Sequence, residues 1–147
     1  NNLEVRREQI FILEDRGQFA DAMKQWQANQ KPLAEKMVFP PQNPQQARIR
    51  EVVYEYRYYI VRCVLLSKQR SPALAKNPAK KEEEYHKLAK NLVATEKDPQ
   101  SADFGGNEVK KLFKELVDSD DLLKKAYIAE GGHALLQDGD LRTSAGQ

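Results

Sequence analysis

The two histidines and the single cysteine are the residues whose side chains are best suited to catalysis or metal binding. Neither His86 nor His133 has a histidine, cysteine or carboxylate four residues later, so the spacing of a helical zinc pair is absent. Cys63 lies on the apolar face of a predicted helix, where a thiol packs as a small hydrophobic side chain. A single cysteine also excludes an intrachain disulfide and a C-x-x-C site. We therefore expect no catalytic residue, no metal site and no cofactor.

Two further motifs contain parts of ligand-binding loops. The acidic run 118–121 lacks the glycine and the terminal glutamate that a calcium loop places at fixed positions, so it is better explained as a helix cap. The glycine pairs 105–106 and 131–132 lack the lysine and hydroxyl residue of a phosphate loop, and no strand precedes either pair. These segments are predicted to be turns, and the chain is predicted not to be an enzyme.

Charge is distributed unevenly along the 147 residues, although the formal net charge is only +2. Residues 62–97 contain nine lysines and arginines against four glutamates, a net charge of +5. Residues 98–140 contain ten acidic residues against five lysines, a net charge of −5. The two segments either bind a partner or a second copy by complementary charge, or neutralise each other within the fold. Glutamates 82–84 interrupt the basic segment and disfavour nucleic acid as a partner.

Composition places the chain among folded, non-membrane proteins. Hydrophobic residues make up 40% of it, which is enough for a core. No apolar run exceeds four residues, whereas a membrane helix needs about 20. The chain opens at Asn1 without a signal segment, so we expect a processed protein or a piece of a longer one. The sequence leaves the cellular compartment undetermined, and the single cysteine slightly favours a reducing one such as the cytoplasm.

Apolar residues recur at helical spacing in six segments, and no segment has the pattern of a strand. Four of them cover residues 3–16, 18–37, 45–69 and 78–97, a fifth is capped by Asn107, and a sixth is capped by Ser119 and ends at glycines 131–132. The prolines in 39–44 make that segment a linker. We expect a single all-α domain over 1–136, with antiparallel hairpins at about 3–37, 45–97 and 107–131, and a flexible tail at 137–147.

The turn between the first two helices carries a specific motif. It consists of a turn glycine, an aromatic residue two positions later, an alanine three further on and an aromatic four beyond that: Gly17, Phe19, Ala22 and Trp26. The motif resembles the tetratricopeptide repeat over about 35 residues, and its pattern is degenerate because Ile10 and Ala34 depart from it. The resemblance implies a right-handed stack of about three antiparallel hairpins, a fragment of an α-solenoid. An irregular helical bundle is the alternative.

The resemblance also implies a binding surface. In this family the first helix of each hairpin lines a concave groove. The matching positions here are Glu4, Arg7, Phe11 and Glu14 in the first hairpin, and Tyr54, Arg57 and Val61 in the second. Tyr54 and Val61 are equally consistent with burial between hairpins. The set lacks the lysine and asparagine pattern with which some members bind a terminal carboxylate.

These features predict a noncatalytic protein-interaction or scaffold module. We expect it to be a structural or assembly subunit of a larger complex, held by protein partners or by self-association. A monomeric adaptor that binds peptides in the groove is the first alternative, and a helical protein that binds nucleic acid is the second.

Overall fold

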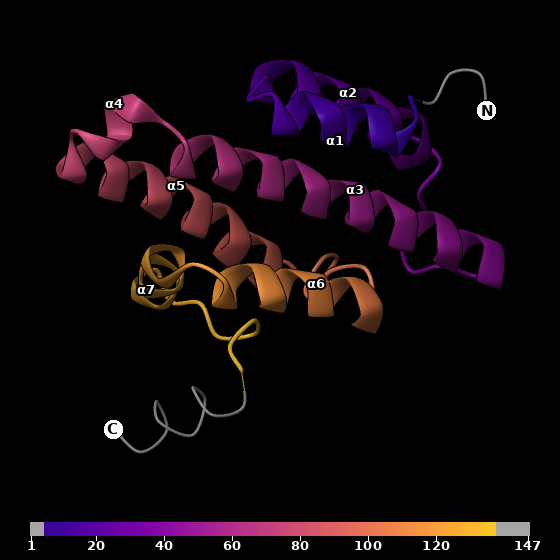
Figure 1. Ribbon diagram of the computed structural model, residues 1–147. Helices are drawn as coiled ribbons and strands as arrows, with labels where there is room; N and C mark the ends of the chain where they lie inside the picture. The colour runs from indigo at the N-terminus through magenta and orange to yellow at the C-terminus, as the bar shows by residue number, and fades with distance from the viewer. Residues whose placement is uncertain (1–4, 138–147) are drawn as a thin grey trace. The chain divides into compact units, whose positions relative to one another are not determined.

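The computed structural model describes residues 5–137, and this part of the chain contains helices and no strands, which confirms the all-α prediction. The helices are α1 (Arg7–Asp15), α2 (Phe19–Ala34), α3 (Pro44–Gln69), α4 (Pro72–Ala75), α5 (Pro78–Lys97), α6 (Asn107–Asp118) and α7 (Asp121–Ala129). The chain divides into two compact units, 1–76 with α1 to α4 and 77–147 with α5 to α7 (Figure 1). The helices expected as one hairpin over 45–97 therefore belong to different units.

The first unit starts with a tight hairpin of α1 and α2. Gly17 has a φ of +76°, a left-handed conformation that residues with a Cβ rarely adopt. Its amide donates to the carbonyl of Glu14 at 2.9 Å, and the amide of Gln18 donates to the carbonyl of Leu13 at 2.9 Å. These two bonds form a Schellman motif, which ends α1 and turns the chain at once into α2.

Helix α2 packs on both α1 and α3, and α1 and α2 lie side by side along α3 in Figure 1. The buried residues at the centre of this packing are Ile10, Ala22, Trp26, Tyr56 and Cys63. The small side chain of Ala22 lets the backbones approach closely, while the aromatic rings fill the space between the helices. The three residues of the predicted repeat motif that follow Gly17 are thus buried or half-buried members of this core or its rim.

A buried asparagine anchors the chain before α1. The side chain of Asn29 on α2 accepts from the amide of Val5 at 2.9 Å and donates to the carbonyl of Val5 at 2.8 Å. Both polar atoms of this buried amide are therefore satisfied. The predicted start of the first helix at residue 3 lies outside the described residues, and the described helix begins at Arg7.

Asparagine followed by proline starts two helices. Asn43 accepts from the amide of Gln46 at 2.8 Å, and Asn77 accepts from the amide of Lys80 at 3.1 Å. Each asparagine is followed by a proline in the first turn, where its fixed φ fits and no amide hydrogen is required. This geometry agrees with the predicted start of the helix at 78.

The structure corrects three details at helix ends. Residues Pro72–Ala75 form a helix, α4, which is too short to show an apolar period in the sequence. Asn107 is the first residue of α6 rather than its cap, because the cap position is occupied by Gly106 with a φ of +132°. Asp120 rather than Ser119 caps α7, because Asp120 is extended and accepts from the amide of Leu123, at 3.0 Å, whereas Ser119 continues the helical conformation of α6.

In the second unit, α7 packs on α5 and on α6. In Figure 1, α6 lies along the picture and α7 is seen nearly end-on, so these two helices cross steeply. The buried residues of α5 to α7 include Tyr85, Leu88, Leu92, Val93, Val109, Phe113, Leu116, Val117, Leu123 and Tyr127. These side chains form the apolar faces by which the three helices pack.

The segment after α7 is held by a tyrosine and a glutamate. The hydroxyl of Tyr127 donates to the carboxylate of Glu96 and accepts from the amide of Leu135 at 2.9 Å. The other oxygen of Glu96 accepts from the amides of His133 and Ala134 at 3.1 and 3.2 Å. These bonds hold residues 133–135 against α5 and α7. Of the tail predicted at 137–147, residues 138–147 lie outside the described residues.

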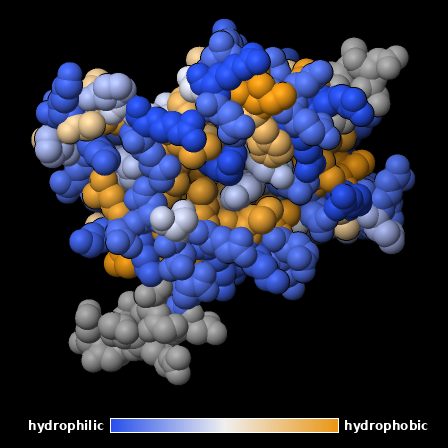
Figure 2. All heavy atoms as spheres, viewed as in Figure 1, coloured by the Kyte–Doolittle hydropathy of each residue, from blue (hydrophilic) through white to orange (hydrophobic). Residues whose placement is uncertain are grey.

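One face of the described residues is mostly polar (Figure 2). Figure 2 shows a face on which hydrophilic residues predominate and apolar residues lie between them. Among the described residues, no helix combines the length and the apolarity that crossing a membrane requires.

Candidate protein-interaction site

Three of the residues predicted for the groove lie on α1, and each contacts a residue of α3. Arg7 forms an ion pair with Glu55 at 2.8 Å. Its guanidinium also lies 5.0 Å from the ring centroid of Tyr56 and 5.4 Å from that of Tyr59. Burial by itself lowers the pKa of Arg7, but the hydrogen bonds to Glu55 and Tyr56 raise that pKa above its ordinary value. Arg7 is therefore a permanent cation that joins the two helices.

The second contact is aromatic. The ring of Phe11 meets the ring of Tyr59 edge-on, with centroids 5.6 Å apart, and meets the ring of Trp26 edge-on at 5.4 Å. Trp26 stacks on Tyr59 with centroids 4.5 Å apart and an interplanar angle of 11°. Edge-on and offset-stacked rings are the favoured arrangements of aromatic side chains. The cluster joins α1, α2 and α3 through one residue of each helix.

The third contact is a buried ion pair. The side chain of Glu14 is only 3% exposed, and its carboxylate meets the guanidinium of Arg62 at 2.6 Å. The same carboxylate accepts from the indole nitrogen of Trp26 at 3.0 Å. The guanidinium of Arg62 also lies 5.7 Å from the ring centroid of Phe11. A carboxylate this deeply buried is stable only when its charge is paired and hydrogen-bonded, and both conditions hold here.

The three contacts share one register. The ion pairs Arg7 to Glu55 and Glu14 to Arg62 each join residues 48 positions apart, and Phe11 lies the same distance before Tyr59. A constant separation means that α1 and α3 run parallel with a fixed register. We call these three pairs the α1–α3 ladder. The ladder is accessible at its edge, because the side chains of Arg7, Glu55 and Arg62 are 34%, 26% and 31% exposed.

The other residues predicted for the groove lie elsewhere. Tyr54 and Val61 are buried, with 5% and 6% of their surfaces exposed. Arg57 is half-buried, and its guanidinium lies 5.6 Å from the ring centroid of Tyr54. Glu4 is outside the described residues. The groove assignment remains a prediction, with Arg7, Phe11 and Glu14 brought together and the α3 residues on a different side of their helix.

The α3 residues of the ladder are Glu55, Tyr59 and Arg62, each one or two positions after a residue that the sequence predicted. Sequence reasoning missed them because a shift of one residue turns a helix face by roughly 100°. The sequence did contain a signal for this pairing of α1 and α3. The spacing of four and then three residues is the same on both helices, and the charges are complementary at both ends.

The ladder offers charged and aromatic contacts and no reactive group. The nearest nucleophile is Cys63, which is fully buried and whose sulfur donates to the carbonyl of Phe19 at 3.5 Å. Burial, and then the nearby carboxylate of Glu14, raises the pKa of the Cys63 thiol to about 12. Such a thiol packs and does not attack. Within residues 5–137, no group of three histidine, cysteine or acidic side chains is placed to hold a metal ion.

No family model, no curated protein and no solved structure matches this chain.

Proposed function

We propose that the chain is a noncatalytic protein-interaction module built from tetratricopeptide-like hairpins, and that it serves as a structural or assembly subunit of a larger complex. The α1–α3 ladder is the observation that carries this proposal. In an array of helical hairpins, the first helices of successive hairpins run parallel and form one face, and each second helix packs behind them. The parallel register of α1 and α3, with α2 packed on both, is the arrangement that such an array requires.

The hairpin turn supports the same proposal. Gly17 allows the tight turn, Ala22 allows the close approach of the helices, and Phe19 and Trp26 fill the space around them. These contacts support the roles that the proposed repeat motif would give the four residues. Ile10 departs from the repeat motif, and the fold accommodates it because its side chain is fully buried in the core beside Trp26.

The composition of the accessible edge supports binding of a protein rather than a small molecule. Arginines and aromatic rings are the side chains that protein interfaces favour, and the edge presents Arg7, Phe11, Tyr59 and Arg62 together. Ile12, which follows Phe11 on α1, is 48% exposed and presents an apolar side chain on the neighbouring side of this helix, beside the ladder.

The test compares two isoleucines of equal chemistry. Ile12 on α1 is 48% exposed, and Ile128 on α7 in the second unit is 45% exposed. Either side chain can be changed to aspartate without burying a charge. Sedimentation velocity of the wild type, Ile12→Asp and Ile128→Asp is measured over about a hundredfold range of concentration. The tagged proteins are also purified from the source cells, and the stoichiometry of any companion is determined.

If the proposal is correct, the wild type self-associates or copurifies with a partner protein at a fixed ratio. Ile12→Asp should weaken that association at least about tenfold, and Ile128→Asp should leave it unchanged. A monomer at every concentration with no stoichiometric companion would overturn the assembly role, and it would favour the monomeric peptide-binding adaptor. Equal loss in both variants would mean that the association does not depend specifically on α1, and it would overturn the assignment to the ladder.

A further inference from the structure

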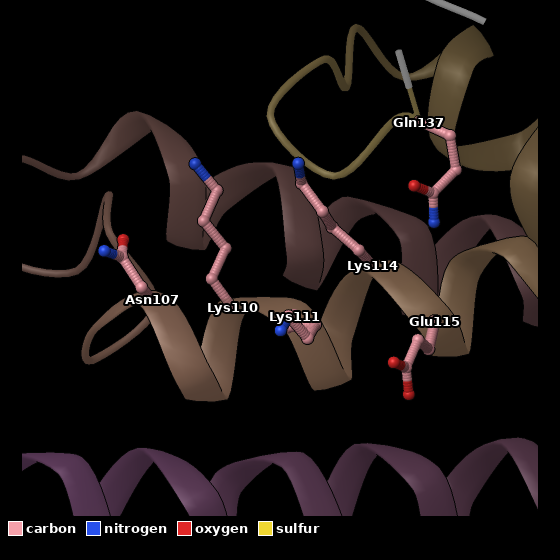
Figure 3. Close-up of a pocket in the computed structure, with 6 residues that line it drawn as sticks. All are labelled: Asn107, Lys110, Lys111, Lys114, Glu115 and Gln137. Atoms are coloured by element: carbon pink, nitrogen blue, oxygen red, sulfur yellow. The ribbon is translucent and has the colours of Figure 1, made fainter. Parts of the chain in front are cut away.

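The second unit contains a cavity that the interaction module does not use. Its volume is about 430 Å³. The cavity lies along α6 and under the segment that follows α7 (Figure 3). Its lining residues are Asn107, Lys110, Lys111, Lys114, Glu115 and Gln137. A volume of this size is near the lower end of the range of small-molecule sites.

The lysines have a defined arrangement. Lys110 and Lys114 are four residues apart, so they project from the same side of α6. In Figure 3 both side chains extend toward the side on which Gln137 lies, whereas the carboxylate of Glu115 points to the other side of the helix. Lys111, four residues before Glu115, lies at the edge between these two sides. The amides of Asn107 and Gln137 lie at the two ends of the set and can each donate hydrogen bonds. Asn107 is also the first residue of α6, where a helix carries a partial positive charge.

The three lysines are not neutralised by the carboxylates of the described residues. Within residues 5–137, no ion pair joins Lys110, Lys111 or Lys114 to an aspartate or glutamate. Other lysines of the same unit do have such partners, such as Lys87 with Glu84 at 2.9 Å and Lys124 with Asp118 at 3.1 Å. Three unpaired ammonium groups around one cavity form a site of high positive potential.

This positive potential is local. Residues 98–140 carry a net charge of −5, and three of their five lysines line the cavity. An extended polyanion such as a nucleic acid would meet the surrounding acidic residues and be repelled. A compact anion that fits inside the cavity would meet mainly the lysines. Lysine binds phosphate as a point charge with three rotatable donors, which suits a small anion with several charged oxygens.

We propose that this cavity is a binding site for a small, multiply charged phosphate anion of the pyrophosphate type. Lys110, Lys111 and Lys114 neutralise its charge, and Asn107 and Gln137 donate hydrogen bonds to its oxygens. The site belongs to the second unit alone, so its test is independent of the interaction role proposed for the α1–α3 ladder.

The test is isothermal titration calorimetry of the whole chain with inorganic pyrophosphate, orthophosphate and sulfate as separate probes. Each titration is made at about 50 mM and about 150 mM sodium chloride, because salt screens this interaction. The site variant is Lys110→Gln/Lys114→Gln. The matched control is Lys90→Gln/Lys125→Gln, which removes the same charge from two exposed lysines of the same unit that do not line the cavity. Circular dichroism establishes that both variants remain folded.

The proposal expects one pyrophosphate per chain, bound more tightly than orthophosphate or sulfate. The site variant should weaken pyrophosphate binding about tenfold or more, and the control should change it less than about twofold. Glu115→Gln, which removes the one carboxylate of the lining, should tighten binding.

Four results would overturn the proposal. They are no saturable binding of pyrophosphate, equal binding of sulfate, equal loss of affinity in the site variant and the control, and tighter binding of a single-stranded oligonucleotide than of pyrophosphate. Asp138 and Asp140 follow Gln137 in the sequence, so Asp138→Asn/Asp140→Asn is titrated as well. Binding that occurs only in that variant would mean that the chain's own carboxylates occupy the cavity, and it would also overturn the proposal.

Discussion

The stability of the protein should depend strongly on which partner of the Glu14–Arg62 ion pair is removed. The side chain of Glu14 is 3% exposed and that of Arg62 is 31% exposed. Removal of the arginine leaves a charged carboxylate in the core, whereas removal of the carboxylate leaves a guanidinium that water can reach. A partner removed from a buried pair costs more than the pair itself contributes, because the remaining charge stays desolvated.

The two single variants give the magnitudes. Arg62→Met keeps the length of the side chain but leaves the buried carboxylate of Glu14 without its ion-pair partner, so we expect a loss of about 3–5 kcal/mol in the free energy of unfolding. Glu14→Gln keeps an oxygen that can accept from Trp26, and it loses the charge-assisted bond to a partly solvated guanidinium. We therefore expect it to lower the free energy of unfolding by about 1–2 kcal/mol.

The double variant completes the thermodynamic cycle. In Glu14→Gln/Arg62→Met no charge is left in the core, so its cost should be close to that of Glu14→Gln alone. The resulting coupling energy should equal the cost of Arg62→Met, about 3–5 kcal/mol, which is the signature of a pair buried together. Arg48→Met is the control, because Arg48 and Glu51 form a surface pair with side chains 68% and 35% exposed, and its cost should stay within about 0.5 kcal/mol.

The assay is urea denaturation followed by the fluorescence of Trp26, the one tryptophan of the chain, which lies in the core of the first unit. Far-ultraviolet circular dichroism monitors both units in the same samples. The slope of the free energy against urea must stay constant for the differences to report stability. A cost of Arg62→Met no larger than that of Glu14→Gln, or a double variant as costly as the two singles added, would refute the burial argument.

Three further predictions concern single residues. A Cβ at position 132 would overlap the ring of Tyr127, which is fixed by its hydroxyl bonds, so Gly132→Ala should cost about 2–3 kcal/mol by thermal denaturation. Burial and then the carboxylate of Asp120 raise the pKa of Tyr85 from 10.0 to about 12, so the folded state holds this proton more tightly than the unfolded chain. This contribution is complete below about pH 10 and is lost as the pH rises toward about 12, and Tyr85→Phe should make the alkaline loss of helical circular dichroism shallower. Since Cys63 is fully buried with a thiol pKa of about 12, a disulfide reagent such as DTNB should label the folded protein at least about a hundredfold more slowly than the protein in urea, and equal rates would contradict its burial.

The helices themselves could be predicted because their signals are local. The apolar period gave α5 with both ends correct, and it gave the long α3 to within one residue at its start. The predicted helix ends were wrong where two neighbouring residues can each cap the helix. Ser119 and Asp120 can both cap a helix, and the choice depends on which one is extended after α6 has ended. The four-residue α4 is shorter than the window in which a period can be recognised.

The sequence by itself determined the hairpin of α1 and α2, because the motif of Gly17, Phe19, Ala22 and Trp26 lies at the turn between these two helices. Only the tertiary structure decided the partners of Arg7, Phe11 and Glu14. Helix propensity and apolar period do not depend on the rotation of one helix against another, and the linker at 39–44 permits several registers. The register is set by which charges and rings meet across α1 and α3. The lysine cavity likewise exists only because the bonds of Tyr127 and Glu96 bring the segment after α7 over α6.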